Sequence, residues 1–439
     1  MSRVFRNKAV LFATCATVYA FGSMASVWAQ SIPQSGVTPP QTGATPSPSF
    51  VPEYAPKGLP LGAFRLYPAL ELAFDSDDNV FRVNNGMKGD TFFEITPRLA
   101  LQSQWARHYL TLRGGATDYI YSQFSSESRV DWDVDAEGRV DVSQGIGIYG
   151  GGSYRHTFEP RSSPDQLKIA REPTPFNVAH GDVRVQAMPN RFGIIAGANY
   201  DHYQYDPTEC CLGLPPSGES SNKDRDYTQW DLYTRLLYEF SPGYSAFAHV
   251  AYNVRDFDLQ FDRNGDDRDS HGYRANVGVQ MELTRLLLGE LYAGYLEQTY
   301  NHEGVAAKAP LGRDSGFNYG AELTWLPSPE LTVRLSASHQ MNETIITNAT
   351  DSNEQRFAFG VDWSIRRNII LHGDVAYLHD NFTGSGREDD LALASIGATY
   401  LMNNYVSWNF RYTYQNRDSN VPLEDFEDSI FRIGLVLQL

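Results

Sequence analysis

The sequence has few cysteines. Cys15, Cys210 and Cys211 are the only three in 439 residues. Adjacent cysteines cannot join distant segments by bonding to each other, so a disulfide framework is excluded as the source of stability. We interpret Cys210 and Cys211 as an ordinary loop pair, with oxidation or binding of a soft metal as the alternatives.

Long apolar runs are also missing after the first 29 residues. None approaches the roughly 20 residues of a membrane helix, and the apolar spacing of amphipathic helices is almost absent. Basic residues are outnumbered, with 36 Lys and Arg against 53 Asp and Glu and a formal net charge of −17. Nucleic-acid binding needs a basic face, so no nucleic acid is expected as a partner.

The amino-terminal region has the pattern of an export signal. Arg3, Arg6 and Lys8 precede an apolar stretch that is too short for a membrane helix, and small residues Val27 and Ala29 mark a cleavage point. We predict a signal peptide over residues 1–29. The Pro-rich residues 30–62 are predicted as a disordered periplasmic lead, either a spacer or a segment that binds a partner.

The rest of the chain is rich in aromatic residues yet polar. Tyr and Phe number 26 and 24, and mean hydropathy is −0.41. Short segments alternate apolar and polar residues, as expected where one face of a strand meets lipid and the other meets water. Long and short connections alternate between them. The pattern predicts an all-β fold over residues 63–439: a transmembrane antiparallel up-and-down β-barrel of about 18 strands, with 16 as the alternative.

The final residues 431–439 show this alternation most clearly. Apolar side chains take the odd positions, and Arg432, Gly434, Val436 and Gln438 take the even ones. A last strand with an uncovered apolar face is physically reasonable against lipid. The pattern resembles the carboxy-terminal signal of outer-membrane barrels, although that signal usually ends on an aromatic residue. The resemblance implies a partner, the barrel-assembly machinery, and a membrane insertion signal of Arg432, Gly434, Leu437 and Leu439.

Charged side chains gather on one face of several predicted strands. A charge on the lipid face costs about 2–4 kcal/mol near mid-membrane, so these faces are predicted to line the lumen. Two strands, residues 289–300 and 391–402, do not sort in this way. The predicted pore-lining residues are Asp131, Asp133, Asp135, Arg139, Asp141, Arg184, Arg235, Arg274, Glu282, Glu322, Arg334, Asp362, Arg366 and Arg411.

These luminal charges allow two interpretations. In one, arginines and carboxylates form a transverse field that selects and orients hydrated solutes. In the other, they pair with one another and stiffen the wall. The acidic face between Asp131 and Asp141 favours cations or neutral sugars over anions in the first interpretation.

Other clusters have alternative chemical interpretations. Asp262–Asp269 has oxygen ligands at alternate positions but lacks the Gly at the sixth position and the Glu at the twelfth that a calcium loop has. Asp77-Asp78-Asn79 is either a solvated turn or a divalent-ion site that bridges lipopolysaccharide. His339, His372 and His379, with Asp374 nearby, suggest an outer-membrane hydrolase as the least favoured function. We therefore predict no catalytic residues, no metal and no cofactor.

Four short motifs carry a resemblance to a known family. They are Gly62-Ala63-Phe64-Arg65-Leu66-Tyr67-Pro68, Asp77-Asp78-Asn79-Val80-Phe81, Pro97-Arg98-Leu99 and Ser103-Gln104-Trp105-Ala106-Arg107-His108. Over residues 62–142 the chain resembles a family of β-barrel porins, also called outer-membrane β-barrel proteins, that is often associated with exopolysaccharide gene clusters. The resemblance implies an outer-membrane location and a partner in exopolysaccharide or its export machinery. It implies no catalytic residues.

The expected function is therefore a passage for hydrophilic solutes across the outer membrane, associated with exopolysaccharide secretion. Outer-membrane lipid and lipopolysaccharide would surround it. The alternatives are a structural or assembly barrel with a plugged lumen, and the hydrolase. By length alone, residues 206–226 are predicted as the loop that folds inward as a constriction.

Overall fold

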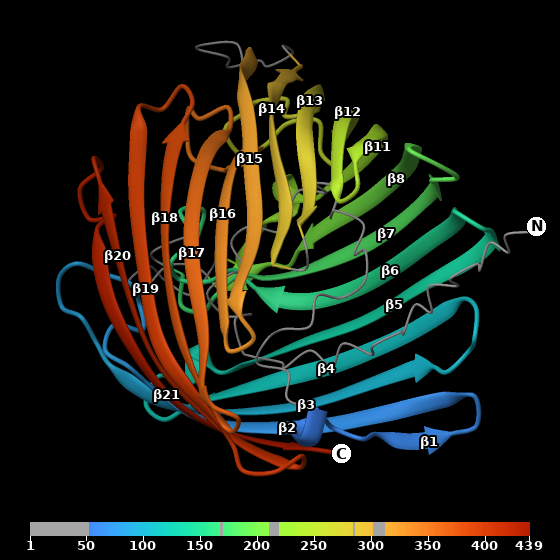
Figure 1. Cartoon of the computed structure of the whole chain (residues 1–439). Coiled ribbons are helices and arrows are strands. Elements are labelled where there is room, and N and C mark those ends of the chain that lie inside the picture. Colours follow the sequence, from blue (N-terminus) through green and yellow to red (C-terminus); the bar gives the residue numbers. More distant parts are fainter. Residues whose placement is uncertain (1–51, 167–169, 210–218, 284–285, 302–311) are drawn as a thin grey trace, which may run out of the picture.

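The computed structural model describes residues 52–166, 170–209, 219–283, 286–301 and 312–439. Its main feature is a closed barrel of 18 antiparallel strands. Figure 1 looks into this ring, with the strands following one another around it in sequence order. The predicted fold class and the count of 18 strands are confirmed.

The strands of the ring are similar in length. They are β2 (Phe64–Asp77), β3 (Asp90–Ser103), β4 (Tyr109–Tyr121), β5 (Arg129–Ser143), β6 (Ile146–Phe158), β7 (Pro175–Ala187), β8 (Phe192–Tyr205), β11 (Tyr227–Ser241), β12 (Tyr244–Phe257), β13 (Ser270–Leu283), β14 (Leu287–Tyr300), β15 (Arg313–Ser328), β16 (Leu331–Asn342), β17 (Ser352–Arg366), β18 (Ile369–Phe382), β19 (Arg387–Leu401), β20 (Val406–Ser419) and β21 (Phe426–Gln438). Outside the ring, short β9 (Thr208–Glu209) pairs with β10 (Glu219–Ser220).

The barrel closes where the first and last ring strands meet. β2 pairs with β21 from Ala69↔Gln438 to Asp77↔Ile430, while its other edge pairs with β3. The Leu439 N–H donates to the Pro68 carbonyl at 3.2 Å. Beyond that point a short strand, β1 (Leu59–Leu61), continues along the same edge of β2. Each strand of the ring is thereby hydrogen-bonded to both of its neighbours, as a membrane requires.

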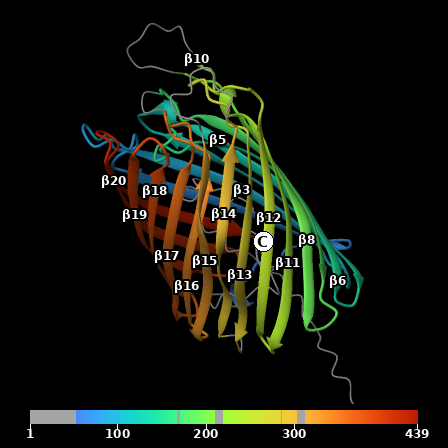
Figure 2. The same cartoon turned by 90° about the horizontal axis from the view of Figure 1, so that it is seen from above.

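Long and short connections leave opposite ends of the barrel. At the short-turn end, Ser143 pairs with Ile146 and Ser241 with Tyr244, so tight turns join these strands. Gly145 and Gly243 adopt φ of 77° and 79°, a conformation that favours glycine. At the long-loop end lie the connections that follow β2, β6, β8, β12 and β16, and Figure 2 shows these two ends of the inclined strands.

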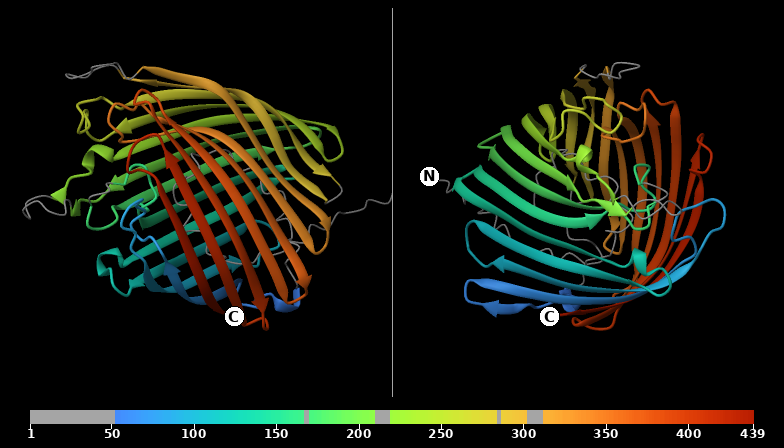
Figure 3. Two further views of the ribbon diagram at one scale, coloured as in Figure 1. Left: turned by 90° about the vertical axis from the view of Figure 1, so that its left-hand side faces the viewer. Right: turned by 180° about the vertical axis from the view of Figure 1, so that it is seen from behind.

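The outer wall is apolar, as the alternation predicts. On β5, Val130, Trp132 and Val134 are 45%, 39% and 50% exposed, with the carboxylates on the opposite face. The left view of Figure 3 shows the strands of this wall running obliquely across the barrel. No helix among the described residues has the length and apolar character needed to cross a membrane.

The structure explains why the sequences of two strands, β14 and β19, do not separate into an apolar face and a charged face. On β14, Leu296 faces inward and is 5% exposed, and Glu297 faces outward with the Tyr273 and Tyr295 hydroxyls donating to it at 3.2 and 3.0 Å. On β19, Leu391 joins an apolar cluster on the inner wall, and Asp390 faces outward against Tyr377 and His379. Tyrosine hydroxyls thus satisfy carboxylates on the outer wall.

The amino-terminal region is described only in part. Residues 1–51, which contain the predicted signal peptide and most of the predicted lead, lie outside the described residues. Within the remainder of the predicted lead, Pro52–Tyr54 forms a 3-10 turn (η1) and Leu59–Leu61 forms β1.

Candidate functional site: the lumen and the segment across it

The acidic face of β5 is largely paired with its neighbours on the wall. Arg113 of β4 lies 3.0 Å from Asp135 and 3.1 Å from Glu137. The Thr157 hydroxyl donates to Asp131 at 3.2 Å. Asp133 lies on the same inward face. Most of the negative charge along this strand is therefore balanced or hydrogen-bonded locally.

Towards the short-turn end, arginines bracket an aromatic ring. Tyr149 of β6 has the Arg139 guanidinium 5.2 Å from its centroid and that of Arg184 at 4.6 Å. Arg139 also pairs with Asp141 at 2.6 Å, and Asp141 accepts from the His108 N–H at 3.1 Å. Cation–π contacts of this kind hold the guanidinium groups in place on the wall.

A second charged group joins strands that are not neighbours. Arg235 of β11 pairs with Glu290 of β14 at 2.9 Å across β12 and β13, a contact that is reachable only from the inside. Arg274 of β13 lies 3.8 Å from Asp231. Glu322 is directly opposite Glu290 in the β14–β15 register. Glu282 lies within β13, and its side chain is outside the described residues.

His372 lies within a hydrogen-bonded chain on the inner wall. Arg334 pairs with Asp362 and with Asp374, the latter at 3.4 Å. Asp362 contacts His372 Nδ1 at 2.7 Å, and His372 Nε2 lies 2.9 Å from Thr399 Oγ1. The Thr399 hydroxyl donates onward to Asn409 Oδ1 at 2.9 Å, so its proton is directed away from His372. This chain favours wall stabilisation over a nucleophilic triad.

The remaining predicted luminal residues have different environments. Arg366 is exposed at the short-turn end of β17, beside an irregularity in the ladder. Arg411 is opposite Arg432 in the β20–β21 register.

The histidines of the hydrolase interpretation lie apart. His379 is on the outer wall with Asp390, and His339 contacts Asn353 Oδ1 at 2.5 Å. The three histidines therefore do not come together.

Arg432, predicted as part of the insertion signal, is the centre of a buried ion-pair cluster. It lies 2.6 Å from Glu94, 3.2 Å from Glu71 and 3.4 Å from Asp75. Gly434 shares its inward face, whereas Leu437 and Leu439 are 37% and 44% exposed on the outside. Sequence reasoning missed the three carboxylates because they lie far from Arg432 in the chain. The alternation of β2 and β3, which places Glu71, Asp75 and Glu94 on the inward face, was the sequence signal that could have identified them.

Residues 159–166, which follow β6, form a segment that crosses the lumen. On the near side, Glu159 accepts from Arg225 Nη2 at 2.8 Å, and Arg161 donates to Glu127 at 2.6 Å. All four side chains are less than 9% exposed. Buried, paired charges of this kind are costly to separate, so the near side is firmly tethered.

On its other side the same segment contacts the connection between β16 and β17 and strand β20. Asp165 Oδ1 accepts from the Thr344 hydroxyl at 2.6 Å and from the Ile345 N–H at 3.0 Å, and Arg417 of β20 donates to the Ser162 carbonyl. Thr344 belongs to residues 343–351, the connection between β16 and β17. Strands β7 to β16 separate the two connections one way around the ring, and β17 to β6 the other.

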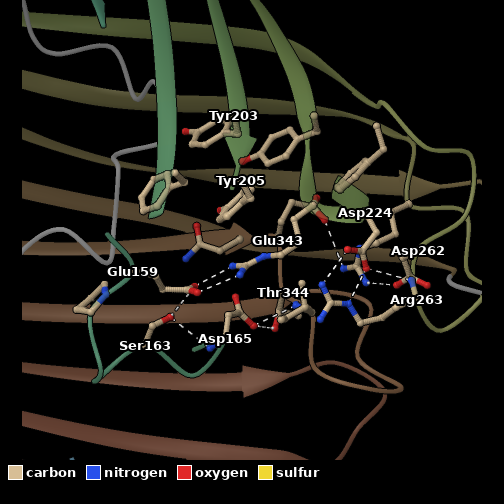
Figure 4. Close-up of a pocket in the computed structure, with 18 residues that line it drawn as sticks. Glu159, Ser163, Asp165, Tyr203, Tyr205, Asp224, Asp262, Arg263, Glu343 and Thr344 are labelled. Carbon is tan, nitrogen blue, oxygen red and sulfur yellow. Dashed lines mark hydrogen bonds and ion pairs between the residues drawn. The ribbon is translucent and has the colours of Figure 1, made fainter. Parts of the chain in front are cut away.

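The segment separates two cavities at the long-loop end. One of about 140 Å³ lies towards β7–β12, and another of about 90 Å³ lies towards β2–β5. Glu159 and Pro160 line both cavities. Figure 4 shows the first cavity, with Asp165 directed at Thr344 and with Glu159, Asp224 and Glu343 among the charged groups around it.

An aromatic stack forms the wall of the larger cavity. Tyr227 stacks on Tyr203 with centroids 4.5 Å apart and on Phe257 at 5.1 Å. Tyr203 and Tyr227 are 7% and 8% exposed, so the stacked rings are largely buried against one another and their neighbours.

The predicted constriction, residues 206–226, is described only in part. Its described part supplies Arg225 as the partner of Glu159, while the segment 159–166 makes the contacts across the lumen. Residues 210–218, with Cys210 and Cys211, lie outside the described residues.

Two acidic clusters have local partners. Asp77, Asp78 and Asp428 have ligand atoms within 4.8 Å of one another, and Arg82 lies 3.0 Å from Asp77 and 3.1 Å from Asp428. The Arg82 guanidinium supplies positive charge at this cluster, for which a divalent-ion site was one of the two interpretations of the sequence. Asp262 accepts from the Asn264 and Asp266 N–H groups at 2.8 and 3.0 Å, as a turn-stabilising carboxylate does.

A closed antiparallel ring with an apolar outside, a charged inside and a segment folded across its lumen defines a porin-like outer-membrane β-barrel. The chain belongs to the family described as "Putative beta-barrel porin 2", whose sequence model matches residues 51–439. The family resemblance predicted from the sequence is confirmed. No curated protein sequence matches the chain.

Solved structures with a similar fold are distant in sequence. The outer membrane protein OpdK from Pseudomonas aeruginosa is 13% identical with a TM-score of 0.44, over 85% of this chain and 99% of that one. A BenF-like porin from Pseudomonas fluorescens Pf-5 is 10% identical with a TM-score of 0.45, over 86% and 100%. The copper transporter OprC is 9% identical with a TM-score of 0.48, over 87% and 82%.

Proposed function

We propose that the protein gives hydrophilic solutes a passive passage across the outer membrane, narrowed at the long-loop end by the segment 159–166. We place that end outside the cell and the short turns in the periplasm, as is usual for such barrels. No reaction is catalysed. The observation that carries the proposal is the charged inner wall of a ring wide enough for a loop to cross it.

The paired charges suggest what the passage selects. Arg113 balances Asp135 and Glu137, and Arg235 balances Glu290. A wall of alternating fixed charges presents many hydrogen-bond partners, which suits neutral hydrophilic solutes such as sugars. This combines the two sequence-based interpretations, because the same pairs that stiffen the wall also line the passage.

Liposome swelling tests this function. Refolded protein in vesicles is expected to admit small neutral sugars, with rates that fall as the sugar grows. A variant with residues 160–165 replaced by a Gly-Ser linker is expected to admit larger sugars, because the segment no longer crosses the lumen. Far-UV circular dichroism of both proteins checks that the barrel has formed. Equal size limits for the two proteins would show that the segment is not the constriction.

The second candidate is a structural barrel whose lumen stays plugged, and the tethers on both sides of the segment 159–166 favour it. That function predicts no swelling by the natural protein and swelling only by the linker variant. The two candidates therefore give opposite results in the same experiment.

The link to exopolysaccharide is supported by the sequence motifs of residues 62–142 alone. We propose exopolysaccharide or its export machinery as the partner, with lipopolysaccharide and outer-membrane lipid around the barrel and the barrel-assembly machinery acting during insertion. Deleting the gene is expected to lower secreted polysaccharide, and expressing it again should restore the amount. An unchanged amount would remove this part of the proposal.

A further inference from the structure

The seam between the first and last ring strands carries three carboxylates at its long-loop end. One oxygen each from Asp77, Asp78 and Asp428 lies within 4.8 Å of the other two. Asp77 ends β2 and Asp428 lies near the start of β21, so ring closure brings them together. Backbone bonds fix the arrangement, because the Ser429 N–H donates to Asp78 Oδ1 at 2.7 Å and the Asp78 N–H donates to the Ser429 carbonyl at 3.2 Å.

Arg82 balances only part of this charge. Its guanidinium lies 3.0 Å from Asp77 Oδ2 and 3.1 Å from Asp428 Oδ2. Three ionised carboxylates and one guanidinium leave a charge of −2, which is the charge that one divalent cation neutralises. Asp78 is exposed, so an ion from the solvent has access to the cluster.

Asp428 provides a second observation that points to a missing ligand. The residue is 2% exposed, and its Oδ2 accepts from Gln415 Nε2 at 2.8 Å and is paired with Arg82. Its Oδ1 is buried and has no hydrogen-bond partner among the described residues, while Asp77 lies against the same carboxyl group. A buried carboxylate oxygen without a partner is costly, and a second carboxylate beside it adds repulsion. A cation at this point removes both costs.

We propose that Asp77, Asp78 and Asp428 bind a calcium ion that clamps β2 to β21 at the seam of the barrel. Calcium binds oxygen ligands at about 2.3–2.6 Å in flexible geometry, so ligands on opposite sides of the ion lie about 4.6–5.2 Å apart. The spacing of the three carboxylates fits this ion, and water on the exposed side of Asp78 completes its shell. Magnesium demands near-octahedral geometry at about 2.0–2.1 Å and fits the cluster less well.

The assignment departs from the expectation of no metal that the sequence supported. Asp77 and Asp78 are adjacent in the chain, whereas Asp428 lies near its other end and joins them only when the barrel closes. The inference concerns the seam and does not depend on the proposed passage. A proton on Asp428 Oδ1 is the alternative occupant, and it predicts no response to calcium.

Urea unfolding of the full-length barrel in phosphatidylcholine vesicles, free of lipopolysaccharide, measures the response. With a dissociation constant of about 1 mM, as in weak extracellular sites, about 10 mM calcium chloride should raise the folded-to-unfolded ratio about tenfold over EDTA. Magnesium chloride at the same concentration should give a clearly smaller change. Absence of a calcium effect would overturn the proposal in favour of the proton, and an equal effect of magnesium would overturn it in favour of general charge screening.

Asp78→Asn tests the site with little disturbance of the seam. Its amide oxygen still accepts from the Ser429 N–H, but the ion loses one charged ligand, so the calcium effect should fall to about twofold. Asp256→Asn is the matched control, since it removes the same charge from an exposed aspartate at the long-loop end of β12 and should keep the full effect. A full effect in Asp78→Asn, or its loss in Asp256→Asn, would overturn the assignment. Conductance does not enter this measurement, so failure of the site and failure of the passage are distinguishable.

Discussion

Arg432 on the last strand and Glu94 on the second ring strand form a double hydrogen bond across the closure of the barrel, at 2.7 and 2.6 Å. β2 lies between them, and its Glu71 and Asp75 contact the same guanidinium. One side chain thus ties β21, β2 and β3 together from the inside. Arg432, the polar residue of the predicted insertion signal, therefore also forms part of the inner wall where the barrel closes.

Arg432→Met should destabilise the barrel by about 3–5 kcal/mol, since it leaves buried carboxylates without their cation. Urea unfolding of the protein in lipid vesicles measures this change. Arg366→Met removes an exposed arginine at the short-turn end and should change stability little. Equal stability of the Arg432→Met variant and the natural protein would mean that closure does not depend on this cluster.

Charge on the outer wall should cost free energy according to depth. Val134 is 50% exposed in the middle of β5, and Val142 is 56% exposed at its short-turn end. Val134→Arg should cost about 2–4 kcal/mol of folding free energy in the bilayer and Val142→Arg about 0–1 kcal/mol. The same unfolding measurement compares them. Similar costs at both sites would contradict the assignment of this face to lipid.

Ion selectivity should follow the pairing of β5. Arg113→Gln leaves Asp135 and Glu137 without their cation, so the reversal potential in a salt gradient should shift towards cation preference. Arg313→Gln makes the same charge change outside the lumen, where Arg313 is paired with Glu297, and should leave the potential unchanged. A shift of equal size in both variants would rule out a luminal role for Arg113.

A side chain at Gly145, in the tight turn between β5 and β6, should lower the stability of the barrel. Its φ is 77°, and a Cβ there would lie 2.6 Å from the Met188 carbonyl oxygen. Gly145→Ala should therefore cost about 1–3 kcal/mol. Gly181→Ala, with nothing within 4 Å of the added Cβ, is the control and should be near neutral. Thermal unfolding of the two variants provides the comparison.

The sequence predicted the features that recur from strand to strand around the barrel. Strand alternation and the alternation of long and short connections depend on local residue order, so the strands could be predicted. The partners of Arg432 and the contacts of the segment 159–166 across the lumen could not be predicted, since they depend on residues brought together by ring closure. Glu297 and Asp390 obscured two strands because tyrosine hydroxyls satisfy these carboxylates on the outer wall.

Single-channel recording on the refolded full-length protein in a planar bilayer tests the central claim most directly. If the charged lumen is a passage, insertion should produce discrete conductance steps that neutral sugars reduce as they enter. Insertion of a barrel that is protected from external protease and rich in β-structure, but gives no conductance steps in the natural protein or in the variant lacking residues 160–165, would contradict it.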